Sequence, residues 1–225
     1  MMQTKSNTNQ AIAAFFDVDE TLITIKSMFN FFEYLSEVKK LHDLKVQFDD
    51  AFKQARANNR PREELNSMYY QLLSGMSMDE LFSIGKIWFE QNVVNNNAFI
   101  QKTVDRLHQH QTRGERTVFV SGSMLPLLKP IAEYLKVDDI LCVNPVVDQQ
   151  RILTGEITGI QTIGAGKATA IEKFALEQEI DLSSSYGYGD DISDLNMLSC
   201  VGHSVYVGDH PTMLQLAKQN NWQVL

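Results

Sequence analysis

The chain has no excess of basic residues, no long hydrophobic run and no apolar stretch within its first ten residues, and each absence argues against a class of protein. Its 225 residues carry 20 Lys and Arg against 28 Asp and Glu, a net charge of −8 at pH 7. Binding to nucleic acid or to an anionic membrane needs a basic face. No apolar run approaches the roughly 20 residues that cross a bilayer. The first ten residues also lack the apolar core of a signal peptide, so we expect a cytoplasmic protein that binds neither nucleic acid nor membrane.

Cysteine and histidine are also scarce, and neither forms a metal-binding pattern. The two cysteines, Cys142 and Cys200, lie in apolar contexts and are not spaced as a C-x-x-C pair, which predicts free thiols in a reducing compartment. His108 and His110 are two residues apart in a helical stretch and therefore face different directions. We predict structural or surface roles for the histidines rather than metal ligation.

The apolar runs that are present predict an α/β fold. Helical patterns separate most of the strand-like runs, which is typical of a doubly wound, Rossmann-like parallel sheet. The predicted strands are 11–17, 116–121, 139–143, 184–189 and 203–207.

Two segments interrupt this alternation of strands and helices. Residues 24–105 contain no convincing strand and read as a helical insertion, in which Pro61 fits the first turn of one helix. Ser77 and Glu80 have the spacing of a capping box at the start of another. The second segment, 144–163, alternates apolar and polar residues around Thr154-Gly155 and predicts a β-hairpin.

The first strand ends in closely spaced acids. Six apolar residues, 11–16, predict a strand buried on both faces, and Asp17-Val18-Asp19-Glu20-Thr21 follows directly. Residues i and i+2 of a strand point to the same side, so Asp17 and Asp19 would project together from its carboxyl end, where open α/β sheets bind ligands. Two neighbouring carboxylates repel each other and need a proton, a cation or a lysine to balance them.

Three further polar features would reach the same edge of the sheet. Ser121-Gly122 closes the second predicted strand, Lys167 opens a helix, and acids at 190, 191 and 194 follow a later strand. Each has a simpler reading on its own: a strand-to-helix turn, a solvated lysine, and helix-capping acids. Because all of them close a predicted strand or open a helix in this order, we interpret them as one site.

As a set, DVDET, the serine of VFVSGS, the lysine of GAGK and the acids of GDDISD resemble the haloacid dehalogenase superfamily of phosphohydrolases. An insertion directly after the first motif is similar to the C1 helical cap of its phosphoserine-phosphatase-like branch. The resemblance implies a catalytic core of residues 11–23 plus 106–225, a cap of residues 24–105 and a flexible tail of residues 1–10.

The resemblance also assigns roles by position. Asp17 would be the nucleophile that forms an aspartyl-phosphate, and Asp19 the acid and base that serves the leaving alcohol and then water. The phosphoryl oxygens would be held by Thr21, Ser121, Gly122 and Lys167. Mg²⁺, which prefers oxygen ligands, would be bound by Asp17, by Asp19 through its carbonyl, and by Asp190 and Asp194. Asp191 would be outer-shell support or a solvated side chain, and Glu20 a solvent-facing turn residue.

These roles predict hydrolysis of a small phosphomonoester metabolite, because Asp19 can protonate an alcohol leaving group. A phosphotransferase that uses an alcohol acceptor would share the same core, and a non-catalytic phospho-ligand binding protein is a further alternative. A kinase is disfavoured, because the Walker pattern needs Gly at 161 and Ser or Thr at 168, where Gln161 and Ala168 stand.

The start of the insertion bears on the choice of substrate. Phosphoserine phosphatases place an acid, which binds the substrate ammonium group, where this chain has Lys26, nine residues after Asp17. We therefore expect weak activity on phosphoserine and a preference for anionic or polyhydroxyl substrates. The candidate substrate contacts are Lys26, Ser27, Met28 and Phe29, followed by Arg56, Arg60 and Arg62. Helix capping, core packing and solvated charge are the simpler readings of these residues.

Overall fold

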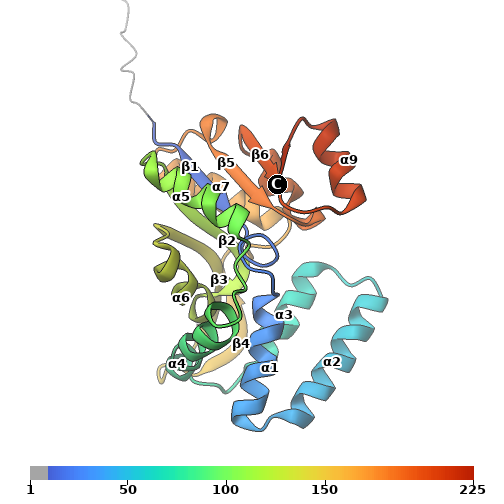
Figure 1. Cartoon of the computed structure of the whole chain (residues 1–225). Helices are drawn as coiled ribbons and strands as arrows, with labels where there is room; N and C mark the ends of the chain where they lie inside the picture. The colour runs from blue at the N-terminus through green and yellow to red at the C-terminus, as the bar shows by residue number, and fades with distance from the viewer. Residues whose placement is uncertain (1–9) are drawn as a thin grey trace, which may run out of the picture.

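A seven-stranded sheet organises the computed structural model, which describes residues 10–225 (Figure 1). The predicted tail, residues 1–10, lies outside this range except for Gln10. The strand order is β4-β3-β2-β1-β5-β6-β7, and every neighbouring pair is parallel except β3 and β4. The strands are β1 (Ala13–Phe16), β2 (Arg116–Met124), β3 (Asp139–Val147), β4 (Leu153–Thr158), β5 (Tyr186–Gly189), β6 (His203–Tyr206) and β7 (Gln223–Val224).

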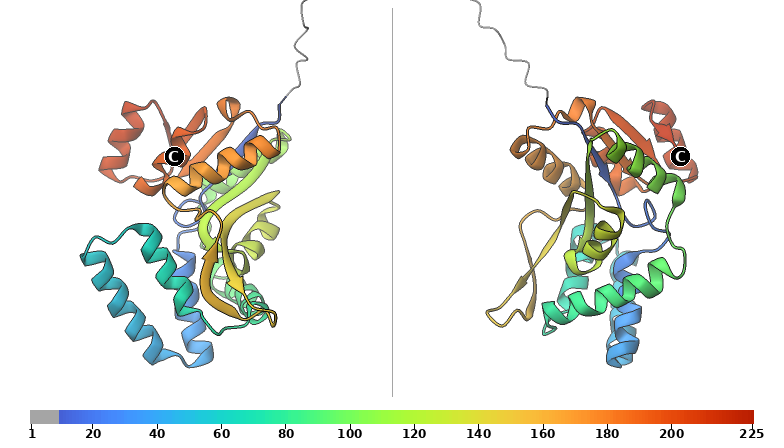
Figure 2. Two further views of the ribbon diagram at one scale, coloured as in Figure 1. Left: turned by 180° about the vertical axis from the view of Figure 1, so that it is seen from behind. Right: turned by 60° about the vertical axis from the view of Figure 1, so that its left-hand side comes forward.

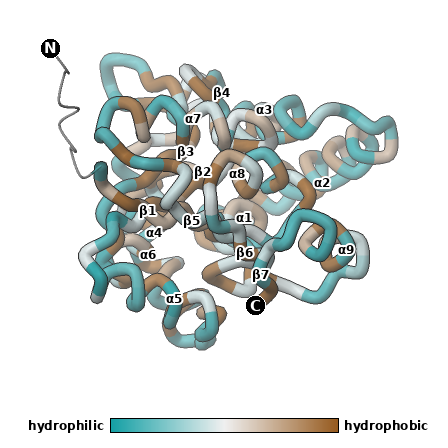
Figure 3. Tube along the Cα trace, turned by 90° about the horizontal axis from the view of Figure 1, so that it is seen from above, coloured by the Kyte–Doolittle hydropathy of each residue, from teal (hydrophilic) through white to brown (hydrophobic). Residues whose placement is uncertain are grey.

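Helices cover both faces of this sheet, as the alternation of side chains along β1 requires (Figure 2). Ala14 and Phe16 pack in the core under α5 (Gln101–Thr112) and α6 (Leu125–Leu135). Ala13 and Phe15 face the opposite core. That second core is closed by α7 (Ala165–Glu177), α8 (Leu195–Ser199) and α9 (Pro211–Gln219). Hydrophobic segments lie along the strands while hydrophilic ones gather at outer turns (Figure 3). The predicted doubly wound α/β fold is confirmed.

The helical insertion extends from the carboxyl end of β1 (Figure 1). It contains α1 (Ser27–Lys39), α2 (His42–Ala57), α3 (Arg62–Leu72), α4 (Met78–Trp88) and the π-helical turn η1 (Phe89–Val94). Helix α2 stands away from the sheet, whereas α3 packs against β4 and α4 packs against α6 of the core. Close contact there requires a glycine, because a Cβ on Gly85 would lie 2.4 Å from the Pro126 carbonyl oxygen.

Both ends of the insertion meet beside the end of β1. The Thr24 N–H donates to the Ala98 carbonyl at 2.8 Å, and the Ile100 N–H donates to the Leu22 carbonyl at 2.9 Å. A bridge between Ile23 and Phe99 lies between these two bonds. The chain therefore leaves and re-enters the core at one point, next to the acids that follow β1.

Three local features differ from the sequence-based expectation. Ser77 accepts from the Glu80 N–H at 3.4 Å, but the Glu80 carboxylate pairs with Lys39, so only half of the capping box forms. The β3–β4 hairpin turns at 148–151, and Thr154-Gly155 lies within β4, where a Cβ on Gly155 would meet the Ser74 Cβ at 3.1 Å. The short edge strand β7 was not predicted, because two residues carry no periodicity. No helix among residues 10–225 is long and apolar enough to cross a membrane.

Candidate active site

A buried lysine lies at the centre of the polar groups that gather at the carboxyl edge of the sheet. Lys167, near the start of α7, places Nζ 2.7 Å from Asp17 Oδ1 and 2.6 Å from Asp194 Oδ1. Burial opposes the charge of Lys167, but the two carboxylates outweigh it and hold the pKa of the ammonium group above its usual range. For Asp17, burial and the neighbouring Asp194 and Asp190 outweigh Lys167 and raise the pKa. Asp17 Oδ2 is the oxygen that this ion pair leaves available.

Asp194 orders the loop that follows β5. Its Oδ1 binds Lys167, and its Oδ2 accepts from the backbone N–H groups of Asp190 and Asp191 at 3.1 and 3.2 Å. Glycine is needed at position 189, because a Cβ there would lie 2.6 Å from the Asp194 Cβ. Asp194 therefore connects the end of β5 to the start of α7.

Three of the four predicted metal-binding acids cluster through their side chains. Asp17, Asp190 and Asp194 each offer a carboxylate oxygen, and these oxygens lie within 4.8 Å of one another. Burial and the Asp194 charge raise the pKa of Asp190 to about 7. Three carboxylates against one Lys167 ammonium leave an excess of negative charge, which suits a divalent cation with oxygen ligands. Thr21, predicted to hold phosphate, donates its hydroxyl to Asp190 Oδ1 at 2.9 Å.

The Asp19 side chain lies apart from this cluster and contacts the insertion instead. Its Oδ2 accepts from the Ser27 N–H, at the start of α1, at 3.0 Å. Its Oδ1 is buried and has no hydrogen-bond partner in the described part of the chain. Burial raises the pKa of Asp19 to about 6 despite the bonds from Ser27. A half-buried carboxyl group with one free oxygen and this pKa is suited to exchange a proton near neutrality.

Ser121 and Gly122 lie where β2 loses its regular register with β3. Ser121 Oγ accepts from the Ser123 N–H at 3.1 Å, and the two carbonyls are held by side chains from other elements. Thr162 donates to the Ser121 carbonyl at 2.5 Å, and Tyr70 donates to the Gly122 carbonyl at 2.9 Å. Sequence reasoning missed Thr162 and Tyr70, because no spacing links them to the motif.

A cavity of about 690 Å³ connects these groups to the insertion. Asp17, Asp19, Ser121, Lys167 and Asp190 line its inner end. The insertion lines the rest with Lys26, Met28, Phe29, Asp49, Phe52, Lys53, Arg56, Arg62, Leu65, Asn66 and Tyr69. The structure thus brings most of the predicted site residues to one cavity, whereas Ser27 is fully buried between Asp19 and Ser123, its hydroxyl 3.3 Å from Ser123 Oγ.

Two ion pairs lie at the rim of this cavity. Lys26 Nζ contacts Glu20 Oε2 at 3.1 Å, and Glu20 has a left-handed φ of 59°, a conformation that favours glycine. Arg62, the first residue of α3, contacts Asp191 Oδ1 at 2.7 Å across the opening. Asp191 also caps the short helix at 192–194 together with Asp194, so it joins the insertion to the loop after β5.

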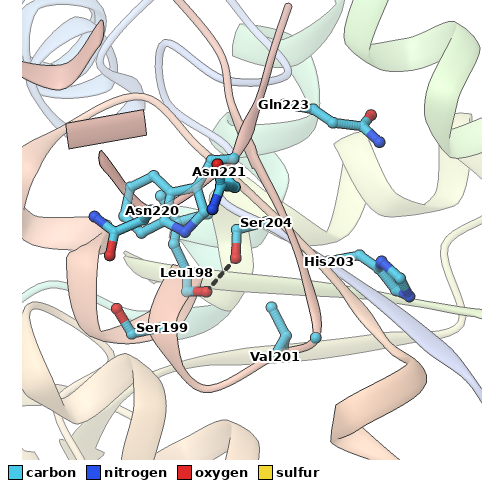
Figure 4. Close-up of a pocket in the computed structure, with 10 residues that line it drawn as sticks. Leu198, Ser199, Val201, His203, Ser204, Asn220, Asn221 and Gln223 are labelled. Carbon is cyan, nitrogen blue, oxygen red and sulfur yellow. Dashed lines mark hydrogen bonds between the residues drawn. The ribbon is translucent and has the colours of Figure 1, made fainter. Parts of the chain in front are cut away.

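A second pocket, of about 290 Å³, lies near the C-terminal strand and is shown in Figure 4. Its lining contains Ser199, Ser204, Asn220 and Asn221 but no acid, lysine or arginine. The Ser204 hydroxyl is already engaged, donating to the Leu198 carbonyl at 2.5 Å. Its one imidazole, His203, stacks on the Tyr186 ring with centroids 4.7 Å apart, and no acid or lysine lies beside it in the lining. The clustered acids and the lysine line the larger cavity, which is therefore the candidate active site.

The fold, and the cluster of acids around a buried lysine at the carboxyl edge of its sheet, agree with the class that the comparisons show, a hydrolase. Residues 14–199 match the family model described as haloacid dehalogenase-like hydrolase, so the chain belongs to this family. The family resemblance predicted from the four motifs is confirmed.

Individual relatives are distant but span most of the chain. A probable phosphatase of Mycobacterium tuberculosis is 27% identical over 219 residues, covering 95% of this chain and 74% of the relative. A solved structure of a protein of unknown function from Bordetella pertussis Tohama I has a TM-score of 0.85 at 22% identity, covering 96% of this chain and 98% of that one. A phospho-aspartyl intermediate analogue of phosphoserine phosphatase has a TM-score of 0.64 at 16% identity, covering 96% and 92%. These similarities to solved structures show the fold.

The raised pKa of Asp19 predicts that its ionisation destabilises the folded protein. A carboxyl group with a pKa of about 6 when folded and 3.8 when unfolded binds protons more tightly in the folded state, so stability falls as pH rises between these values. We expect Asp19→Asn to become more stable than the wild type across this range, with a gain of roughly 2–3 kcal/mol at pH 7. Urea unfolding of both proteins from pH 4 to 7 in a chelator checks this, and a pH-independent difference would contradict it.

Proposed function

We propose that this protein is a Mg²⁺-dependent phosphatase that hydrolyses a small phosphomonoester through an aspartyl-phosphate on Asp17. One observation carries the proposal: Lys167 holds Asp17 at the inner end of a cavity that a second acid, Asp19, also lines. The names of the distant relatives, which include phosphatases, support the same reaction class.

In the first step an Asp17 oxygen attacks phosphorus and the ester P–O bond breaks. A carboxylate nucleophile divides hydrolysis into two displacements. Asp19 gives its proton to the departing alcohol oxygen, so a neutral alcohol leaves. Lys167 and the backbone at Ser121-Gly122 would bind the phosphoryl oxygens, on which the transferred charge is spread.

In the second step the ionised Asp19 takes a proton from water as the water oxygen attacks phosphorus. The bond between Asp17 and phosphorus breaks, which releases inorganic phosphate and restores the Asp17 carboxylate. Asp19 is protonated again and both acids return to their starting states. One side chain serves as acid and then base because its pKa of about 6 lies close to the working pH.

The cluster of Asp17, Asp190 and Asp194 would hold the metal ion, with the Asp19 carbonyl as a further ligand. When bound, Mg²⁺ would neutralise charge on the phosphoryl group and on the crowded carboxylates. Both carboxylate oxygens of Asp194 already accept hydrogen bonds, one from Lys167 and the other from two backbone N–H groups. We therefore propose that Asp194 mainly orders the site and contributes less than Asp17 and Asp190 to binding the metal.

We propose that residues 24–105 act as a cap on a core of residues 11–23 and 106–225. A cap that covers the site favours a small phosphorylated metabolite over a phosphoprotein. We further propose that the reaction takes place in the cytoplasm. A phosphotransferase would use the same first step and differ only in the acceptor, so assays should include an alcohol acceptor and look for its phosphorylated product.

Replacement of the nucleophile should stop the reaction without disturbing the fold. We expect Asp17→Asn to reduce Mg²⁺-dependent phosphate release to the level without enzyme, because it keeps the shape and removes the nucleophilic charge. Asp19→Asn should lower turnover by about 10²–10⁴-fold. Asp50→Asn, an exposed acid of α2, is the matched control. Near wild-type turnover in Asp17→Asn would contradict the proposed mechanism.

Metal binding can be measured apart from turnover. A ligand present at about 100 times its Kd raises the free energy of unfolding by about 2.7 kcal/mol. We expect Mg²⁺ to stabilise the wild type by this amount, and Asp190→Asn to lose most of the gain because a carboxylate ligand is gone. Asp209→Asn, an exposed acid, should keep the gain. Equal stabilisation of all three proteins would argue against the site.

We also predict that phosphoserine is a poor substrate. Lys26 cannot pair with an ammonium group, and its own ammonium group forms an ion pair with Glu20 at the rim of the cavity. Steady-state kinetics over phosphorylated sugars, nucleotides, amino acids and amino alcohols would test this. A kcat/KM for phosphoserine above that of every other compound in the panel would overturn the prediction.

A further inference from the structure

One wall of the active-site cavity is built from aromatic rings of three different helices. Phe29 comes from α1, Phe52 from α2 and Tyr69 from α3, and all three line the cavity. The Phe29 and Phe52 ring centroids are 5.0 Å apart at 69°, and those of Phe29 and Tyr69 are 6.4 Å apart at 70°. The rings meet edge to face, which is a favoured arrangement of aromatic pairs. They form a single apolar surface, which we call the ring wall.

The exposure of Phe29 is not explained by packing of the insertion. Phe31 and Phe32, on the same helix, are buried in the core, whereas Phe29 is 41% exposed and lines the cavity. An aromatic side chain left open to a concave site that also contains reacting groups is typical of a ligand contact.

The ring wall is held in place from behind. The Tyr69 hydroxyl donates to the Met28 carbonyl at 2.8 Å, which restrains that ring. The buried Phe48 packs against the other two rings: its centroid lies 5.4 Å from that of Phe52 and 6.2 Å from that of Tyr69. A preformed surface loses little conformational freedom when a ligand binds to it.

The size of the cavity agrees with a ligand larger than a phosphorylated three-carbon unit. Its volume of about 690 Å³ lies within the roughly 300–1,000 Å³ found for pockets that enclose drug-sized molecules. The acids and Lys167 occupy the inner end, and the ring wall lies on the insertion side. A phosphoryl group bound near Asp17 would direct its leaving group toward that side.

We infer that the leaving group of the substrate carries a planar apolar ring, which binds against Phe29 and Phe52, with the buried Tyr69 packed against Phe29. The inference rests on the proposed phosphatase function and specifies its substrate class. Phe29 and Phe52 are then specificity-determining residues, because they contact the leaving group and take no part in the transfer of phosphate.

Two synthetic esters with similar leaving alkoxides test this directly. 2-Phenylethyl phosphate and propyl phosphate both release a primary alcohol, so a difference in kcat/KM reports binding of the ring. Contacts between aromatic rings contribute about 0.5–1.5 kcal/mol, so we expect the phenyl ester to be favoured by up to about tenfold. Equal values for the two esters would overturn the inference.

Substitutions in the ring wall test whether the preference for the phenyl ester arises there. We expect Phe29→Ala and Phe52→Ala each to lower the ratio of the two kcat/KM values about fivefold. Phe29→Leu, which preserves apolar bulk, should lower it as well. Val46→Ala, an exposed residue of α2 outside the cavity lining, is the matched control and should leave the ratio unchanged. A ratio unaffected by both Phe29 variants would overturn the assignment.

Binding of unreactive analogues separates this inference from the proposed function. Calorimetry with 2-phenylethylphosphonate and propylphosphonate measures ring recognition without hydrolysis. Tighter binding of the phenyl compound that is lost in Phe29→Ala supports the ring wall even if neither ester is hydrolysed, in which case only the phosphatase proposal fails. Equal binding of both phosphonates contradicts the ring wall.

Discussion

The structure of the site depends on the ion pairs that Lys167 makes with Asp17 and Asp194. An ion removed from water costs several kcal/mol unless it is well paired, and all three of these side chains are buried. Each partner sits on a different part of the sheet edge: Asp17 after β1, Asp194 after β5, and Lys167 near the start of α7. The pairing therefore sets the relative positions of the strand ends as well as the charge of the site.

Three other features of the site cost free energy that an ordinary turn would not. Glu20 adopts a left-handed backbone, Asp19 keeps a buried oxygen without a hydrogen-bond partner among residues 10–225, and the pKa of Asp190 is raised to about 7 by burial and Asp194. Such departures persist where the surrounding fold determines them, and they are typical of functional sites. Here β1 and β5 supply that support, since both strands are paired on each side.

The sequence allowed the positions of site residues to be predicted where they directly follow a recognisable strand. The acids at 17, 19, 190 and 194 could be placed on one edge because parallel strands end at the same edge of a sheet. The contacts that orient those acids could not be predicted. Ser27 binds Asp19 and Arg62 binds Asp191 only because the insertion folds back over the edge, and helical periodicity does not define that position.

The join between the insertion and the core also has an evolutionary consequence. Thr24 and Ala98 already contact each other, so the strand order and the acids do not depend on the length of chain between them. An ancestor could exchange these helices by recombination at this junction, provided that the new segment again contacted Asp19 and the Gly122 carbonyl, as Ser27 and Tyr70 do. Selection for new substrates would then act on the inserted segment, while the strand order of the sheet was inherited unchanged.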